Sequence, residues 1–135
     1  MRPEEGRRDK REESGERSMA QAKEDTGELF RQQVSRLDYA HYLVLCWCAQ
    51  SEDKNIKYNI TNCFDDLKSC GVTRTKQTAV AVIETLYALS FVDIRDERNR
   101  KNLYISSWGA KALQQMVLNE TYVMRKSTYL EEYQP

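Results

Sequence analysis

Two stretches of the chain concentrate side chains that donate hydrogen bonds or carry positive charge. Residues 73–78 hold hydroxyl, guanidinium, ammonium and amide groups in consecutive positions. Residues 95–101 hold four cationic side chains among polar neighbours. Arginine, lysine and glutamine donate to phosphates and to base edges, and threonine can do either. The two stretches therefore indicate a surface that contacts DNA.

Hydrophobic spacing predicts the elements that position these side chains. The expected helices cover residues 28–50, 61–69, 75–89 and 107–126, and the expected strands cover residues 56–60, 91–95 and 103–106. In the third helix, Ala79, Val82, Ile83 and Leu86 recur on one face, so the opposite face is left free. Residues 96–102 are all polar and predict the tip of a β-hairpin. The fold class expected is mainly α with a small β-hairpin.

The free face of the helix at 75–89 and the tip of the hairpin are the expected contact surfaces. The first turn of such a helix comes within reach of base edges. Small side chains at Val80 and Ala81 let the helix approach closely and meet thymine methyl groups. The predicted DNA-contacting residues are Thr73, Arg74, Thr75, Lys76, Gln77, Thr78, Val80, Ala81, Arg95, Arg98, Arg100 and Lys101.

These stretches resemble the winged helix-turn-helix regulators of the MarR and PadR type. Residues 75–86, followed by Phe91 and Val92, resemble their recognition helix and first wing strand. Residues 103–113 resemble the second wing strand and the start of the next helix. The resemblance implies a helix that enters the major groove of double-stranded DNA, with a wing beside it. The length and the flanking helices are also similar to those of PadR-like regulators of the cyanobacterial circadian clock.

Single positions both support and weaken this resemblance. Ser106, Gly109 and Leu113 keep the family spacing of a hydroxyl residue, a glycine and a leucine. Ser106 is expected to cap the last helix. The chain departs from the pattern at Ser90, where these families usually place a glycine for a left-handed turn. That departure makes the end of the preceding helix uncertain.

The two outer helices are longer than a DNA-binding domain needs. Apolar stripes of this length usually mark an interface, so they predict a homodimer. A dimer presents two recognition helices to half-sites about one DNA turn apart. The alternative is that the two helices pack on each other within one chain. The predicted interface residues are Leu29, Phe30, Val34, Leu37, Leu113, Met116, Val117, Val123 and Met124.

Composition limits the class of protein. Lys plus Arg and Asp plus Glu are both 21, so the net charge of zero argues against histone-like binding by bulk charge. Residues 1–26 are highly charged and are expected to form a disordered tail, and residues 27–135 the winged-helix domain with its flanking helices. No apolar run approaches the roughly 20 residues that span a bilayer. The N-terminus lacks the apolar stretch of a signal peptide, so a cytoplasmic, nucleoid-associated location is expected.

Little in the chain indicates catalysis. The four cysteines, Cys46, Cys48, Cys63 and Cys70, are expected to be buried thiols. A metal site or a redox-sensing thiol are the alternatives considered. The single histidine, His41, is expected to pack within a helix. The chain has no glycine-rich phosphate loop and no metal-ligand spacing, so no enzyme activity, cofactor or metal is expected.

The sequence therefore predicts a dimeric, sequence-specific transcriptional regulator that binds double-stranded DNA. We expect a repressor, because no segment resembles an activation domain. The alternative is a winged-helix adaptor for protein interaction or DNA partition. The aromatic residues Tyr39, Tyr42 and Trp47 are expected in the core, although a small-molecule effector site between dimer helices is a second use for them.

Overall fold

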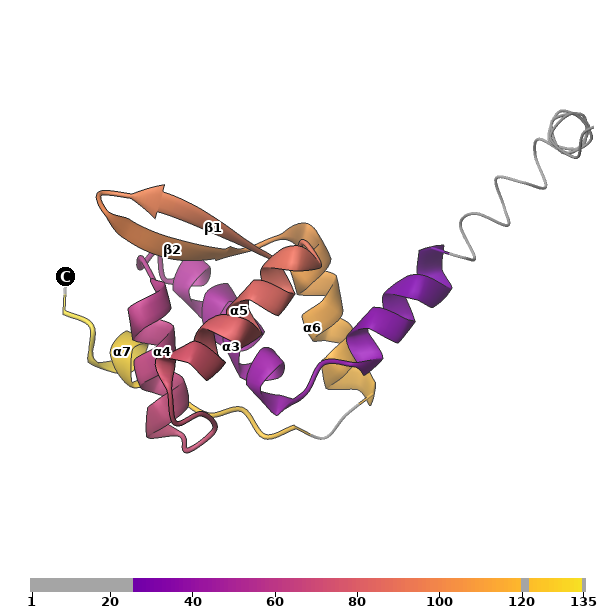
Figure 1. The fold of residues 1–135 in the computed structure, drawn as a ribbon, viewed down its shortest axis with the longest axis horizontal. Coiled ribbons are helices and arrows are strands. Elements are labelled where there is room, and N and C mark those ends of the chain that lie inside the picture. Colours follow the sequence, from indigo (N-terminus) through magenta and orange to yellow (C-terminus); the bar gives the residue numbers. More distant parts are fainter. Residues whose placement is uncertain (1–25, 120–121, 135) are drawn as a thin grey trace, which may run out of the picture. The chain divides into compact units, whose positions relative to one another are not determined.

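The computed structural model describes residues 26–119 and 122–134. This part of the chain is mainly helical and has one small antiparallel β-hairpin (Figure 1), as the sequence predicts. After a helix at residues 26–35, the elements are α3 (Tyr39–Asp53), α4 (Ile60–Ser69), α5 (Lys76–Ala88), β1 (Val92–Glu97), β2 (Arg100–Ile105), α6 (Ser107–Asn119) and α7 (Thr128–Glu132).

The chain divides into two units, Met1–Gln33 and Val34–Pro135, and all labelled elements belong to the second. In the first unit, Arg31 and Glu28 form an exposed ion pair at 2.9 Å along the helix at 26–35. The tail predicted at residues 1–26 lies outside the described residues, apart from Thr26.

The single helix predicted over residues 28–50 is wrong, because the helix is broken before α3. The first helix ends at Ser35, and Asp38 caps α3. The Asp38 carboxylate accepts the backbone N–H of His41 at 3.4 Å, and Nδ1 of His41 accepts the Asp38 N–H at 3.1 Å. Such reciprocal capping satisfies donors that the start of a helix leaves open, so it fixes a new helix start here.

The α3 helix forms the centre of the core. The side chains of Leu43, Val44, Leu45, Trp47 and Cys48 have no exposed surface. The helix contacts α4, α5, α6 and β2. A helix that is apolar on every side must be covered on every side. The aromatics Tyr42 and Trp47 are therefore core residues, as predicted, whereas Tyr39 is only half-buried.

Three helices end with the same left-handed turn. Asn55, Gly71 and Ser90 follow the caps of α3, α4 and α5 with φ of 56°, 75° and 63°. At the end of α5, Phe91 N–H donates to the Leu86 carbonyl at 2.9 Å, which completes a Schellman motif. Gly71 thus ends α4 as expected. Ser90 adopts a left-handed conformation, which glycine adopts more readily than serine.

The N-cap of α4 lies two residues earlier than predicted. Asn59, rather than Thr61, is its N-cap. The Asn59 side-chain oxygen accepts a hydrogen bond from the Asn62 N–H at 2.8 Å. The Asn62 side-chain oxygen in turn accepts one from the Asn59 N–H at 3.0 Å. The strand predicted over residues 56–60 is reduced to a single bridge between Asn59 and Asn102.

The β-hairpin is longer and tighter than predicted. Pairing runs from Val92–Ile105 to Glu97–Arg100, so most of the expected loop at 96–102 belongs to the strands. Arg98 and Asn99 alone form the turn, with φ of 53° and 65°. Two successive left-handed residues are typical of a type I′ turn, whose twist matches that of the strands.

The C-terminal region differs most from the prediction. The helix expected over 107–126 ends at Asn119, and residues 122–127 are not helical. The predicted cap is confirmed, because Ser106 Oγ accepts the Gly109 N–H at 2.9 Å. Among the described residues, no helix is both long enough and apolar enough to cross a membrane.

Candidate nucleic-acid interface

The α5 helix exposes a polar first turn beside the hairpin. Lys76, Gln77 and Thr78 are exposed, whereas Ala79 and Ile83 are buried against the core. The apolar stripe thus orients the helix, so its polar residues point away from the core.

Three of the predicted contact residues are less available than the rest or serve a structural role. Thr73 is only 5% exposed, so its prediction as a surface contact is wrong. The turn between α4 and α5 places it inward, and its hydroxyl has no hydrogen-bond partner among the described residues. Thr75 is exposed but accepts the Thr78 N–H at 3.2 Å as the cap of α5. Val80 is half-buried, whereas Ala81 is exposed.

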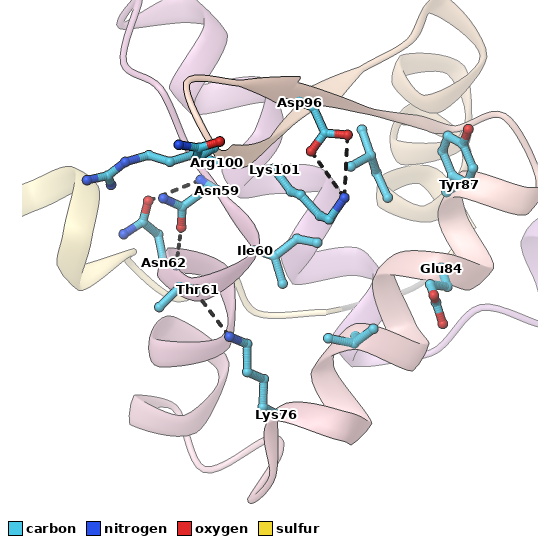
Figure 2. Close-up of a pocket in the computed structure, with 13 residues that line it drawn as sticks. Asn59, Ile60, Thr61, Asn62, Lys76, Glu84, Tyr87, Asp96, Arg100 and Lys101 are labelled. Carbon is cyan, nitrogen blue, oxygen red and sulfur yellow. Dashed lines mark hydrogen bonds and ion pairs between the residues drawn. The ribbon is translucent and has the colours of Figure 1, made fainter.

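A groove of about 950 Å³ separates α5 from the hairpin (Figure 2). Ile60, Val80 and Ile94 contribute its apolar lining. Its polar lining comes from Asn59, Thr61, Asn62, Lys76, Glu84, Tyr87, Asp96, Asn99, Arg100 and Lys101. The groove therefore combines the first turn of α4 with one face of α5 and one face of the hairpin.

Two of the predicted cations are already neutralised. Arg95 contacts Asp93 at 2.9 Å and stacks over the Tyr104 ring at 4.1 Å. Lys101 reaches into the groove and binds Asp96 at 3.1 Å (Figure 2). These exposed pairs are weak, but each must be broken before the cation can bind another anion.

Four other cations are available. Arg74, Arg98 and Arg100 are exposed and form no ion pair within residues 26–119 and 122–134. Arg100 points away from α5 (Figure 2). Lys76 makes only a long hydrogen bond of 3.4 Å to the Thr61 hydroxyl. Among the predicted contact residues, the unpaired positive charge therefore lies at the start of α5 and at the tip of the hairpin.

Carboxylates limit the positive field of the groove. Glu84 is exposed on α5, and Asp96 lies on the hairpin beside Lys101. A phosphate is repelled near these groups and attracted near Lys76 and Arg100. The groove therefore has a positive region near Lys76 and Arg100 and a negative region near Glu84 and Asp96.

The hairpin is anchored by a network around Glu97. This carboxylate accepts hydrogen bonds from Asn102 at 2.7 Å and from Tyr104 at 2.5 Å, and Lys57 lies 3.6 Å away. These hydrogen bonds, that of Asn102 foremost, lower the pKa of Glu97. The Leu103 N–H also donates to the carbonyl of Tyr58 at 2.8 Å. The network therefore holds the strands directly beside the Arg98–Asn99 turn.

Sequence reasoning missed the contribution of α4. Ile60, Thr61 and Asn62 line the groove because Asn59 starts the helix at its edge. The spacing of Asn59 and Asn62 is a capping signal that places this helix start. Tyr87 and Ile94 were also missed, because neither continues a polar pattern.

The predicted dimer residues fall into two groups. Val34, Leu37 and Met116 are buried within the chain and are core residues, so their assignment to an interface is wrong. Leu29, Val117, Val123 and Met124 are exposed, and Phe30 and Leu113 are half-buried. Trp108 and Leu118 on α6 are exposed as well and were not predicted.

The four thiols and the histidine lie in the core or in a helix cap. Cys46, Cys48 and Cys63 are buried, whereas Cys70 is half-buried. Burial raises the pKa of all four thiols, which disfavours the reactive thiolate. His41 contacts Asp38 in the cap of α3. Among the described residues, no group of three or more potential ligands lies close enough to hold a metal ion.

Comparisons with known proteins add no relative: no family model matches the chain, and no curated protein matches it. The function must therefore be argued from the groove and its surroundings.

Proposed function

We propose that the chain is a winged helix-turn-helix regulator that binds double-stranded DNA with sequence preference. The observation that carries this proposal is the position of the unpaired cations. Arg74 and Lys76 flank the start of α5, and Arg98 and Arg100 lie at the tip of the adjacent hairpin. Cations on both sides of a groove can neutralise neighbouring phosphates of a DNA strand that lies in the groove.

In this arrangement α5 is the recognition helix. Its exposed first turn offers the Gln77 amide, which can form a paired hydrogen bond with adenine. The hairpin is the wing, and the network around Glu97 holds the adjacent Arg98 and Arg100 toward phosphates or the minor groove. The apolar lining of the groove admits the sugar edge of the backbone between the two contacts.

We further propose that the regulator is a homodimer and a repressor. Trp108, Val117 and Leu118 are exposed apolar side chains on α6, and the Val123 and Met124 side chains are exposed as well. A two-fold pair of chains through these side chains would present two α5 helices to a palindromic site. Occupation of such a site blocks access to a promoter.

The test is duplex binding by the wild-type chain and by Gln77→Ala. The wild-type chain should select preferred duplexes from a random pool, and its affinity should fall as salt rises. Gln77→Ala should cost about 1–3 kcal/mol on the selected duplex and less on random duplexes. Thr85→Ala, on the exposed face near the other end of α5, is the matched control and should leave the selected site preferred. Equal loss on all duplexes would contradict base reading by Gln77.

A second candidate is a protein-interaction or DNA-partition adaptor. The carboxylates Glu84 and Asp96 and the apolar lining favour it, because a groove of mixed charge also suits a peptide. Absence of duplex binding at low salt by the folded chain would favour this candidate.

A further inference from the structure

The last described segment, residues 122–134, follows α3 along its length. The Tyr39 hydroxyl, in the first turn of α3, donates to the Val123 carbonyl at 2.6 Å. Two turns later, Trp47 Nε1 donates to the Arg125 carbonyl at 2.8 Å. Both bonds use the main chain of the segment, so they fix its path along α3.

The segment then attaches to α4 through a buried carboxylate. Asp66 is 2% exposed and accepts hydrogen bonds from the Ser127 hydroxyl and from the Tyr129 N–H at 3.2 Å. Its third donor is the Tyr58 hydroxyl at 2.6 Å. Leu130 is 4% exposed and fills the core beside this cluster. Because a buried charge is costly without donors, Asp66 depends on the segment while it is covered.

Few side chains of the segment enter the core. Residues 123–126 are exposed, and only Ser127 and Leu130 are buried. Segments with few buried contacts open at lower free energy than the core. When this segment opens, water can take the place of Ser127 and Tyr129 as hydrogen-bond donors to Asp66. The Asp66 carboxylate therefore adds little to the free energy of opening.

The attachment point and the groove share one helix. Asp66 follows Asn62 by about one turn of α4, and Asn62 lines the groove. Figure 1 shows α7, in yellow, beside α4. A rigid helix transmits a change at one end to the other end.

We propose that residues 122–134 are a strap that clamps α4 against α3 and so regulates the groove. With the strap docked, the first turn of α4 is held at the edge of the groove. With the strap released, α4 loses one of its attachments and the groove loosens. The regulatory part of this proposal rests on the proposed DNA binding, whereas the clamp does not.

The chain's two tryptophans allow a direct test. Trp47 is buried against the strap, and Trp108 is exposed on α6, so Trp108→Phe leaves Trp47 as the sole reporter. In this full-length background, Ser127→Ala with Leu130→Ser should release the strap. Glu132→Ala is the matched control on the same segment, because the Glu132 side chain is exposed and forms no ion pair among the described residues.

Strap release should shift Trp47 emission to longer wavelength and speed amide exchange in α4 at least about tenfold. Affinity for the selected duplex should fall about fivefold or more. The control should change none of the three. If the double variant does not fold, as judged by circular dichroism, Asp66→Asn replaces it, because the amide keeps the shape and loses acceptor capacity for the strap.

Each result decides part of the proposal. A Trp47 shift without faster exchange in α4 would overturn the clamp. Faster exchange with unchanged duplex affinity would overturn the regulation of the groove. If the wild-type chain binds no duplex, the proposed function fails, and amide exchange alone still decides whether the strap clamps α4.

Discussion

At the scale of single residues, Gly109 sets the distance between α6 and the chain that enters β1. A Cβ at this position would lie 1.9 Å from the Phe91 carbonyl oxygen and 2.9 Å from an Ile105 side-chain carbon. The backbone oxygen cannot rotate away, so any side chain must push α6 outward. The absence of a side chain at position 109 thus has a steric reason.

Gly109→Ala should lower the free energy of unfolding by about 1–3 kcal/mol, because overpacking forces a backbone shift. Urea denaturation followed by circular dichroism measures this change. Gly27→Ala is the control, because its Cβ would meet only the end of Arg31 at 3.6 Å. The control should keep or slightly raise stability. An unchanged stability of the Gly109 variant would show that α6 can move freely.

A substitution at Ser90 can measure the backbone strain in the left-handed turn after α5. With φ of 63°, serine pays a backbone cost that glycine does not. Ser90→Gly should therefore raise stability by up to about 1 kcal/mol in the same assay. Ser69→Gly lies within α4 and should lower it by about 0.5–1 kcal/mol. A loss at both positions would mean that the Ser90 turn is not strained.

Cys70 is the most accessible of the four thiols, and burial raises its pKa above the ordinary value of 9.0. A raised pKa leaves less thiolate at neutral pH, so labelling by a disulfide reagent should be slow there. The rate should keep rising at a pH where a free cysteine has reached its plateau. The other three thiols should react only on unfolding. Fast labelling at neutral pH would instead support the redox-sensing alternative.

At the scale of elements, the sequence predicted the helices that have one clear apolar face. The α5 helix was placed within a residue at each end, because Ala79, Ile83 and Leu86 mark its buried stripe and Thr75 its cap. The mixture of helices with one hairpin also followed from periodicity.

Breaks within continuous apolar spacing were missed. Val34, Leu37 and Leu43 keep a helical rhythm across the cap at Asp38, so spacing alone could not reveal the new start. Beyond Asn119, Val123 and Met124 prolong the rhythm although the chain is no longer helical there. The contacts of that segment with Tyr39, Trp47 and Asp66 are long-range and have no local signal.

The hairpin offers a comparison between a free and a paired cation. Arg100 has no ion pair among the described residues, whereas its neighbour Lys101 is bound to Asp96. Arg100→Ala should weaken all duplexes alike and reduce the salt slope by roughly one unit. Lys101→Ala should have a smaller effect, because Lys101 must first leave Asp96. Titrations of specific and random duplexes at several salt concentrations measure both. Equal slopes for wild type and Arg100→Ala would remove Arg100 from the interface.

At the scale of the whole molecule, the open question is what covers the exposed apolar side chains of α6. Leu118 is 76% exposed, and Trp108 and Val117 are about half exposed. Exposed apolar patches of this kind mark interaction sites in soluble proteins. The proposed homodimer is the simplest way to cover them.

Light scattering at micromolar concentration should give twice the chain mass. Leu118→Lys should return the mass to that of one chain, because a buried ammonium at a two-fold interface faces its own copy. Ser69→Lys adds the same charge on an exposed residue of α4 and should leave the dimer intact. A monomeric wild type would remove the two-half-site geometry from the proposed function.

The burial of residues 42–48 in α3 has a consequence when the protein unfolds. Residues 42–48 form a run of seven residues without charge or proline, and all seven are buried aliphatic, aromatic or sulfur-containing residues. Uncovered, such a run favours β-pairing between chains. The flanking charges Asp38, Glu52 and Asp53 border the run without interrupting it. Once heated past its transition, the protein should therefore precipitate rather than refold, and storage conditions matter more for it than its stability alone would suggest.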